Sequence, residues 1–378
     1  MRRLSLRSLR EILMRNRREF LINVAGATAG AFVVGGGLAG MAAAQAPATR
    51  RRAMIGGRRI TVVDIHAHHF VPEVIDIIRG TPLEMEFKGQ AANKDRYLGP
   101  GWLQYMDKEG IDISVLNMNP WWYAADRDLA RRVCDFQNEK TAEWVKRYPD
   151  RFVGMATCAL QHPDLAAEQL EYGVKKLNFR GAPIGGSVEG QELSDRKFDP
   201  FWAKAEQLGV MLFMHPQQAP GTTSNSRLEG KGALGNTIGN PLETTVFLSH
   251  LIFEGTLDRF PGLKICAAHA GGYLPSYLGR SDARCGRGGG QGDCTKLKPS
   301  EYFRRNLYID SMIFREEGLR NLVAEVGADH MFYGTDFPFD WPVGIDFILN
   351  AKVLNDQQKE AILGGNLIKL LGLKPVAS

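Results

Sequence analysis

Val62-Val63-Asp64-Ile65-His66-Ala67-His68-His69 is a run of β-forming residues that ends in histidines. Successive side chains of a strand point to opposite faces, so His66 and His68 share a face and can present both imidazoles to one point. A metal site at the end of a strand requires this arrangement of ligands. The other ligands of such a site must then come from residues later in the chain.

Short apolar runs rich in β-forming residues alternate with helical patterns from residue 60 onward. This alternation is typical of βαβ units, and eight such strands predict a (β/α)8 barrel of the TIM type. The active site of such a barrel lies at the C-terminal ends of its strands. An open doubly wound sheet is the alternative, although no Gly-x-Gly-x-x-Gly motif follows the first strand. The predicted strands lie near residues 61–66, 111–117, 152–158, 175–180, 210–215, 263–268, 306–310 and 331–335, and the predicted helices include 126–147, 163–172, 241–254 and 316–326.

Three of the later strands end in a polar side chain of a kind that binds metals. His215 follows the fifth strand, His269 the sixth and Asp336 the eighth. Any one of these residues could simply cap its strand through a hydrogen bond. Together with His66 and His68 they make a pattern of four imidazoles and one carboxylate, which meet at one point when the barrel closes. We therefore predict a metal site at this end of the barrel.

The ligand types restrict the metal. Imidazoles with one carboxylate suit Zn(II), and Mn(II), Fe(II) and Co(II) are also possible. A site with two ions usually has a further bridging group on a middle strand, such as a carbamylated lysine. Lys175 and Lys176 open the predicted fourth strand at its N-terminal end, which is the wrong end for the site. We therefore expect one divalent ion, with zinc as the first choice.

Five motifs at the predicted strand ends carry a resemblance to a known family. They are Asp64-Ile65-His66-Ala67-His68, His215-Pro216, Pro241-Leu242-Glu243-Thr244-Thr245, His269-Ala270-Gly271-Gly272 and Gly334-Thr335-Asp336-Phe337-Pro338. Together they resemble the amidohydrolase superfamily. More narrowly, they resemble its branch typified by aminocarboxymuconate-semialdehyde decarboxylase, which includes related aromatic-acid decarboxylases. The resemblance runs from about residue 61 to about residue 372, and we assign 61–373 to the barrel domain.

The resemblance implies roles for individual residues. It implies that His66, His68, His215 and Asp336 bind a single divalent metal. It also implies that His269 acts as general base on metal-bound water or substrate, and that Asp336 can share in moving protons.

Candidate substrate contacts are less sharply defined. Arg280 matches in spacing a family arginine that reaches across a homodimer interface to a substrate carboxylate, although a solvated helix arginine fits the pattern equally well. Trp122 falls where the family places aromatic rings, with core packing as the alternative. Arg180, at the end of the predicted fourth strand, could serve a carboxylate or an ion pair. The first loop departs from the family pattern, because only Lys94 and Arg96 are available there to replace its arginines.

The resemblance implies a metal-dependent carboxy-lyase, a non-oxidative decarboxylase that acts on a small aromatic or unsaturated carboxylic acid. A metal-dependent hydrolase of a lactone or amide is the alternative, favoured by the departure in the first loop. The two chemistries share their metal ligands, so the motifs do not separate them. A third possibility is an exported metal-binding protein without turnover.

The N-terminus predicts export. Residues 1–46 carry seven Arg and two Glu, and Arg17-Arg18 precedes a weakly apolar stretch from Ile22 to Ala44 that ends in an A-x-A site, Ala44-Gln45-Ala46. This pattern resembles a twin-arginine signal, read by the twin-arginine export machinery, and predicts a periplasmic protein. An uncleaved membrane anchor is the alternative. Residues 47–60 are expected to be a linker, with a poorly ordered lead-in from Arg50 to Arg59.

Charge and cysteine usage add two expectations. Without the N-terminal 46 residues, the 47 basic and 42 acidic residues of the chain fall to 40 of each, which gives no support to a nucleic-acid partner. Cys134, Cys158 and Cys266 lie in apolar stretches and are predicted to pack in the core. Cys285 and Cys294 flank a glycine-rich loop and could form a disulfide in an oxidising periplasm.

Overall fold

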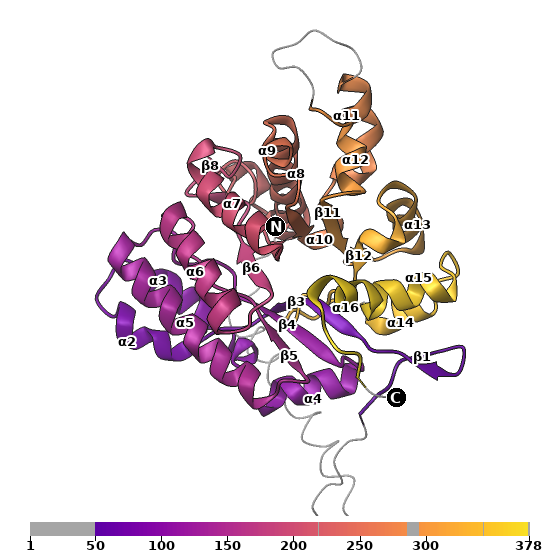
Figure 1. The fold of residues 1–378 in the computed structure, drawn as a ribbon, viewed down its shortest axis with the longest axis horizontal. Helices are drawn as coiled ribbons and strands as arrows, with labels where there is room; N and C mark the ends of the chain where they lie inside the picture. Colours follow the sequence, from indigo (N-terminus) through magenta and orange to yellow (C-terminus); the bar gives the residue numbers. More distant parts are fainter. Residues whose placement is uncertain (1–49, 218, 286–294, 343, 377–378) are drawn as a thin grey trace, which may run out of the picture. The chain divides into compact units, whose positions relative to one another are not determined.

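Eight parallel strands surrounded by helices form the centre of the protein (Figure 1). The structure is a computed structural model that describes residues 50–217, 219–285, 295–342 and 344–376. The described part belongs to one compact unit, Ala48–Ser378. Its barrel strands are β3 (Val63–His68), β4 (Ile113–Asn117), β5 (Phe152–Gly154), β6 (Gly181–Ile184), β9 (Met211–Met214), β10 (Lys264–Ala267), β11 (Leu307–Asp310) and β12 (Met331–Phe332).

Two seams close these strands into a barrel. Ladder hydrogen bonds join the strands in the orders β3-β4-β5 and β6-β9-β10-β11-β12. At one seam, the Ile65 N–H of β3 donates to the Tyr333 carbonyl just after β12 at 3.0 Å. At the other, the Ala156 N–H after β5 donates to the Gly181 carbonyl of β6 at 2.7 Å. The predicted (β/α)8 barrel is confirmed.

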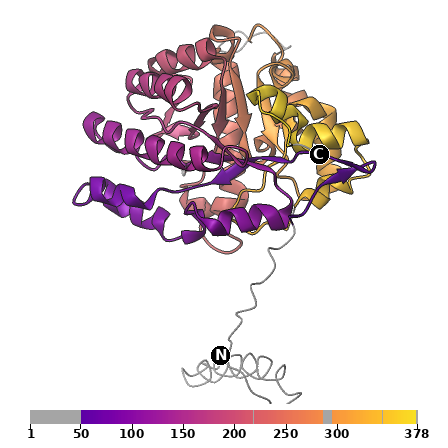
Figure 2. The ribbon, with the colours of Figure 1, turned by 60° about the horizontal axis from the view of Figure 1, so that its bottom comes forward.

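Helices follow the strands and cover them from outside (Figures 1 and 2). In the longest described helix, Asp126 caps the N-terminus by accepting the Leu129 N–H at 2.9 Å, and buried Leu129 and Val133 face the core. The helices are α2 (Ile75–Ile78), α3 (Leu83–Ala91), α4 (Pro100–Glu109), α5 (Arg127–Arg147), α6 (Pro163–Lys176), α7 (Asp199–Leu208), α8 (Asn240–Phe253), α9 (Thr256–Arg259), α10 (Ala268–Gly271), α11 (Leu278–Cys285), α12 (Pro299–Phe303), α13 (Glu316–Glu325), α14 (Ile345–Leu349), α15 (Asp356–Glu360) and α16 (Asn366–Leu371).

Both faces of the barrel strands are buried, as expected for parallel strands covered by helices. One cluster gathers side chains of opposite strands inside the barrel, including Val63, Val115, Phe213 and Phe332. The strand residues between them belong to a second cluster that packs beneath the helices. This double burial explains why the strands are continuous apolar runs in the sequence.

One predicted strand is wrong. Seven of the eight predicted ranges overlap an observed strand, but residues 175–180 do not, because α6 continues to Lys176 and β6 begins only at Gly181. The lysines and the β-forming residue Phe179 in that range suggested a strand, whereas the chain there is still completing a helix. Arg180 therefore lies at the start of β6, and not at its C-terminal end.

The lead-in to the barrel is ordered from Arg50 onward, contrary to the expectation of a poorly ordered linker. Strands β1 (Met54–Ile55) and β2 (Arg58–Arg59) form a hairpin. Ala53 and Ile55 are buried against the barrel, so the segment gains apolar contacts that its arginine-rich sequence obscures. A second short hairpin, β7 (Ser187–Val188) with β8 (Gln191–Glu192), follows β6.

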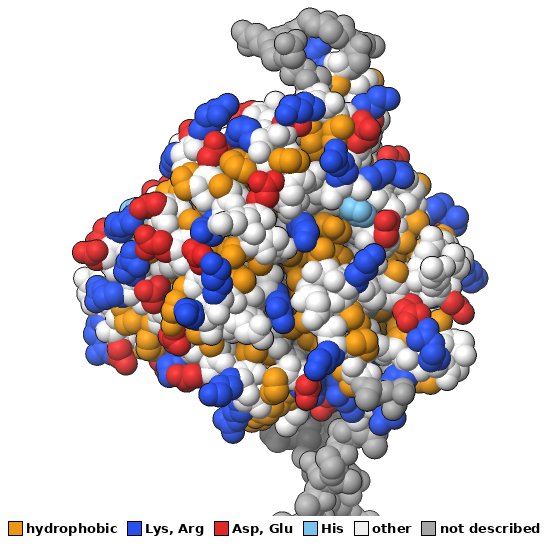
Figure 3. All heavy atoms as spheres, in the orientation of Figure 1, with side chains coloured by type: hydrophobic (Ala, Val, Ile, Leu, Met, Phe, Trp, Pro, Cys, Tyr) orange, Lys and Arg blue, Asp and Glu red, His pale blue; other side chains and the backbone are white. Residues whose placement is uncertain are grey.

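Residues 1–46, predicted to be a signal peptide, lie outside the described residues. In the part of the chain that the structure describes, no helix combines the length and the apolar character needed to cross a membrane. Basic and acidic side chains are interspersed over the face drawn in Figure 3.

The cysteines divide as the sequence suggests. Cys134, Cys158 and Cys266 are buried free thiols. Cys285 ends α11 and is disulfide-bonded, while Cys294 lies outside the described residues.

A buried carboxylate fastens the hairpin to the barrel, and its loss should destabilise the fold. Asp112 accepts the Val62 N–H at 2.9 Å, an Arg50 Nη2–H at 2.6 Å and an Arg59 Nη2–H of the hairpin at 3.0 Å. Replacing Asp112 by Ala leaves the buried Val62 N–H without its acceptor and removes the carboxylate from both arginines, so we expect the free energy of unfolding to fall by about 3 kcal/mol in urea denaturation. Asp346→Ala, which removes an exposed partner of Arg51, should cost less than about 1 kcal/mol. Equal losses in the two variants would contradict this account of Asp112.

Candidate metal centre

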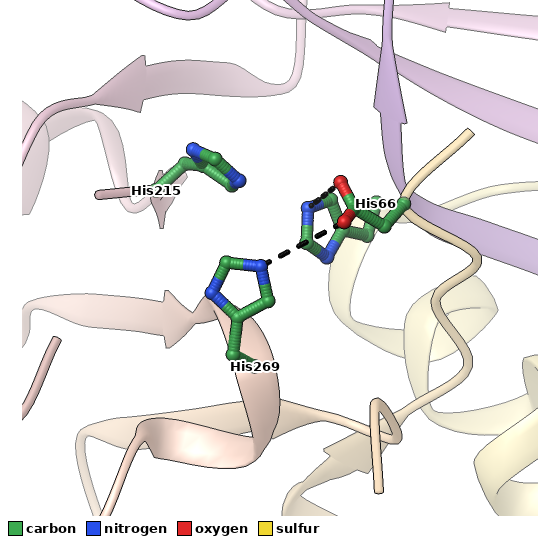
Figure 4. Close-up of side chains that lie close together, drawn as sticks. His66, His215 and His269 are labelled. Atoms are coloured by element: carbon green, nitrogen blue, oxygen red, sulfur yellow. Dashed lines mark ion pairs between the residues drawn. The ribbon is translucent and has the colours of Figure 1, made fainter. Parts of the chain in front are cut away.

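The predicted ligands come together at the C-terminal ends of the strands. His66 lies on β3, His215 follows β9, His269 follows β10 and Asp336 follows β12. One ligand atom from each of these four residues lies within 4.8 Å of all the others. Figure 4 shows the three imidazoles facing a common point.

His68 joins the same cluster from β3. Its Nε2 lies 3.0 Å from the Asp336 Oδ1 and 3.0 Å from the His66 Nε2. The His66 Nε2 is also 3.0 Å from that Asp336 oxygen. The structure therefore brings together all five residues that the sequence analysis singled out, with side chains buried except for a small exposed part of His269.

The donor atoms fit a divalent cation. His66 donates its Nδ1–H to Asp310, and the His215 Nδ1 lies 2.8 Å from the Pro216 carbonyl, to which it can only donate. In the neutral rings these bonds leave the Nε2 lone pairs of His66 and His215 directed at the cluster. Imidazole lone pairs and a carboxylate oxygen at one buried point are the ligands that Zn(II) and related ions prefer.

Asp310 is a residue of the site that the sequence analysis missed. It is fully buried at the end of β11, and its Oδ2 accepts the His66 Nδ1–H at 2.6 Å. It also accepts the backbone N–H groups of His269 at 3.0 Å and Ala270 at 2.7 Å. One carboxylate thus orients a predicted ligand on β3 and the loop that carries His269. The signal was present, because Asp310 ends an apolar strand just as Asp336 does.

Asp64 ties the first strand to the last. Its carboxylate accepts the Thr335 Oγ1–H at 2.6 Å, the Thr335 N–H at 3.1 Å and the His66 N–H at 2.9 Å. Burial raises the pKa of Asp64 to about 6, although these hydrogen bonds oppose the rise. The residue therefore holds His66 and Asp336 beside each other through the backbone.

Glu243 explains the motif at the start of α8. It is buried and accepts the backbone N–H groups of Gln217 and Ala219, at 2.5 Å and 2.8 Å. These bonds fasten the chain directly after His215. The carboxylate in Pro241-Leu242-Glu243-Thr244-Thr245 therefore shapes the loop beside the metal centre.

The backbone of the site is held in uncommon conformations. His269, Ala270 and Asp336 have φ values of 55°, 57° and 58°, in the left-handed region that residues other than glycine rarely adopt. A Cβ at Gly272 would lie 2.3 Å from the Pro241 carbonyl oxygen, so only glycine fits there. Strain of this kind is concentrated at functional sites, where the surrounding structure enforces it.

Charge is distributed unevenly among the imidazoles. Burial lowers the pKa of His66, but the charge of Asp336 and the hydrogen bonds to Asp310 and Asp336 outweigh it and raise that pKa to about 10. Burial lowers the pKa of His68 to about 4 and also lowers that of His215. The negative charge that favours a proton on His66 would equally favour a cation at this point.

Trp341 is a second residue that the sequence analysis missed. Its Nε1–H donates to the Asp336 Oδ2 at 2.8 Å, and the His269 Nε2 lies 3.8 Å from the same oxygen. The carboxylate therefore turns one oxygen toward His66 and His68 and the other toward Trp341. No periodic pattern marks Trp341, since it lies in the loop between β12 and α14.

The three residues predicted to contact substrate do not lie at the metal centre in this structure. Trp122 is fully buried and donates its Nε1–H to the Cys158 carbonyl at 3.0 Å, so it packs in the core, whereas its neighbour Trp121 lines a surface cavity. Arg180 lies at the opposite end of its strand from the metal centre. Arg280 is exposed on α11 and is not among the residues that line the cavity beside His269.

Arg96, one of the two basic residues that the sequence analysis named in the first loop, is buried. The residue ends the short helix η2 (Lys94–Arg96), and its side chain is buried, although one nitrogen donates to Gln90 at 2.5 Å. Its Nε and Nη2 have no hydrogen-bond partner. Burial lowers the pKa of Arg96 to about 10, and the charge of Asp336 opposes this fall. Sequence could not show the burial of this side chain, because a loop imposes no periodicity on its side chains.

Comparison with known proteins places this site in a family. The sequence profile of the amidohydrolase family matches residues 63–373. The chain belongs to the amidohydrolase family. The chain thus belongs to a family of enzymes, and the predicted resemblance is confirmed.

Similar proteins place this amidohydrolase in the decarboxylase branch. It is 30% identical to 2-amino-3-carboxymuconate-6-semialdehyde decarboxylase of Dictyostelium discoideum, over 72% of this chain and 76% of that protein. The crystal structure of 5-carboxyvanillate decarboxylase from Sphingomonas paucimobilis superimposes on this fold with a TM-score of 0.73, over 83% of this chain and 100% of that chain. The two sequences are 26% identical. Dihydroxybenzoic acid decarboxylase from Polaromonas sp. JS666, solved with manganese and the inhibitor 2-nitroresorcinol, is 27% identical with a TM-score of 0.71, over 83% and 97% of the two chains.

Asp310 should control metal affinity without binding the metal. Replacing it by Asn exchanges one carboxylate oxygen, which only accepts hydrogen bonds, for an amide NH2 group, which only donates them. His66 and the His269 loop therefore lose their orientation. We expect the affinity for a divalent ion to fall by about 10- to 100-fold, measured by competition with a chelating dye. Asp329→Asn, at an exposed aspartate after α13, is the matched control. An unchanged affinity in Asp310→Asn would contradict the orienting role.

Proposed function

We propose that this amidohydrolase is a divalent-metal-dependent carboxy-lyase that releases carbon dioxide, without oxidation, from a small aromatic or unsaturated carboxylic acid. The observation that carries the proposal is the buried guanidinium of Arg96, which has two unpartnered nitrogens and whose pKa responds to the charge of Asp336 in the metal centre. A buried guanidinium with free donors is suited to bind a carboxylate. The decarboxylases among the similar proteins support the same reaction.

The metal would be held by His66, His68, His215 and Asp336. When bound, a divalent ion supplies a positive charge that polarises a coordinated substrate oxygen and stabilises the electron-rich state left as carbon dioxide departs. The donor set favours Zn(II), and the manganese bound to the Polaromonas enzyme supports Mn(II) as an alternative.

The chain's own residues position the acid and manage the proton. Arg96 neutralises and orients the carboxylate that is lost. The bond between the substrate carbon and the carboxylate breaks, its electron pair stays on that carbon, and a proton must be delivered there. His269 is suited to this step, because its Nε2 faces the centre and an imidazole can both hold and release a proton. The Asp336 Oδ2, 3.8 Å from that nitrogen, can share the proton.

Hydrolysis is the less favoured chemistry. Its support in the sequence was the departure of the first loop from the family pattern. The buried, partly unpartnered Arg96 favours decarboxylation instead, because a lactone or amide has no carboxylate for it to bind.

Assembly and location complete the proposal. The protein acts as a homodimer in which the exposed Arg280 on α11 reaches the substrate carboxylate of the partner's site, as the family resemblance implies. It is exported by the twin-arginine machinery and works in the periplasm, as the paired arginines before residue 22 suggest. Recovery of the protein only from the cytoplasm in cell fractionation would contradict the export.

The reaction can be tested with purified, metal-loaded protein and a panel of hydroxybenzoates, carboxymuconates and lactones in D2O. We expect one carbon dioxide for each acid consumed and one deuterium at the vacated carbon. Consumption of a lactone with water incorporation and no carbon dioxide would establish hydrolysis instead.

Two variants link the reaction to the site. His269→Asn should lower kcat by at least about 100-fold, since it removes the proton donor. Arg96→Gln should mainly raise KM for the acid, because the lost interaction is already made in the ground state. Arg79→Gln, at an exposed arginine of the same connecting segment, serves as the control.

A further inference from the structure

A cavity of about 520 Å³ opens beside the metal centre on the side of His269. It lies between the start of α8, the turn η6 (Leu274–Tyr277) and α13. Its walls are mainly apolar side chains, among them Tyr273, Met312, Ile313, Leu322 and Trp341. The exposed ring of Phe314 lines the cavity as well. The centroids of the Phe314 and Trp341 rings lie 5.2 Å apart.

The charge of the lining restricts what the cavity can take. Apart from His269 and Tyr273, none of the described residues that line it has an ionisable side chain, and burial raises the pKa of Tyr273 above its ordinary value. A carboxylate placed there would lose its hydration without gaining a cation from the lining residues of the same chain, so this lining suits a neutral group. The polar side chains in the lining, such as Asn236, Asn240 and Asn321, are uncharged amides. Arg96, which suits the carboxylate, is not part of this lining.

The size of the cavity also matters. An engineered cavity of about 150 Å³ in another protein holds one benzene molecule. The cavity beside His269, at about 520 Å³, is more than three times as large and lies within the range of sites for drug-sized ligands. A substrate with a single ring held at the metal would leave most of this apolar wall in contact with water.

Trp341 connects the cavity to the reacting groups. One edge of its indole donates to Asp336 at 2.8 Å, while the residue also lines the cavity. A group seated in the cavity would therefore contact the residue that orients a predicted metal ligand. This contact joins the cavity to the catalytic centre and distinguishes it from an unrelated surface hollow.

We propose that the cavity is a subsite for a neutral, apolar substituent, so that the preferred substrates are aromatic acids carrying a second ring or a chain of several carbons. The inference rests on the proposed decarboxylase function and specifies its substrate class. Binding of the substituent removes apolar surface from water on both partners, which supplies affinity in proportion to the area buried.

The test compares 2-hydroxybenzoates that carry hydrogen, butyl or phenyl at each free ring position in turn. Binding to the metal-loaded protein is measured by calorimetry, and turnover is measured separately as carbon dioxide release. We expect at least one substituted acid to bind about tenfold more tightly than the unsubstituted acid. Equal affinities throughout the series would overturn the subsite.

Asn321→Phe places a ring at the mouth of the cavity from the exposed face of α13, where folding is least at risk. We expect it to reduce the affinity ratio of the substituted to the unsubstituted acid to about one. Arg320→Phe adds the same ring one residue earlier on α13, outside the cavity lining, and should keep the ratio. Retention of the ratio in Asn321→Phe, or its loss in Arg320→Phe, would contradict the proposal.

Turnover and oligomeric state distinguish a substrate subsite from a binding surface of another kind. Tighter binding of substituted acids without carbon dioxide from any of them would keep the subsite and reject the decarboxylase function. Sedimentation tests whether a second copy of the chain fills the cavity. A wild-type dimer that Asn321→Phe converts to monomer, with no ligand preference in either form, would make the cavity an interface and overturn the subsite.

Discussion

The hydrogen bonds from Thr335 to the buried carboxylate of Asp64 hold the first and last barrel strands together, and the metal centre depends on them. His66 and His68 come from β3, whereas Asp336 follows β12 at the other end of the chain. Without this seam the histidines would share a strand but would have no carboxylate beside them. The closure of the barrel is therefore also the assembly of the site, since one aspartate serves both.

Three buried aspartates lie in or beside the metal centre, and each has different hydrogen-bond partners. Asp336 faces the imidazoles directly, Asp310 orients His66 from behind, and Asp64 accepts only neutral donors. Burial raises the pKa of Asp310, but the hydrogen bond and charge of His66 outweigh it and hold that pKa below its ordinary value. Burial dominates at Asp64, whose pKa is raised. Similar side chains thus acquire different roles from the groups around them, as buried carboxylates generally do.

Charged and apolar binding groups are separate in this protein. The buried guanidinium of Arg96 has unpartnered donors, while the cavity beside His269 is lined mainly by apolar side chains and does not include Arg96. In the proposed function this separation would orient an aromatic acid, because its charged end and its neutral body would each have only one favourable place. Trp341 connects the cavity to the metal centre, through its bond to Asp336 and its contact with Phe314.

The sequence by itself determined the barrel class and the five residues of the cluster. Strand periodicity is local, and a polar residue that ends an apolar run can be recognised without knowledge of the rest of the chain. Asp310 obeyed the same rule and could have been included. The tertiary structure alone decided the burial of Arg96, the burial of Trp122 and the contact of Trp341 with Asp336. It also showed that Arg180 directly precedes its strand and that Met54 to Arg59 form a packed hairpin. These properties depend on partners far away in sequence, such as Asp112 for the hairpin, and no local pattern encodes such contacts.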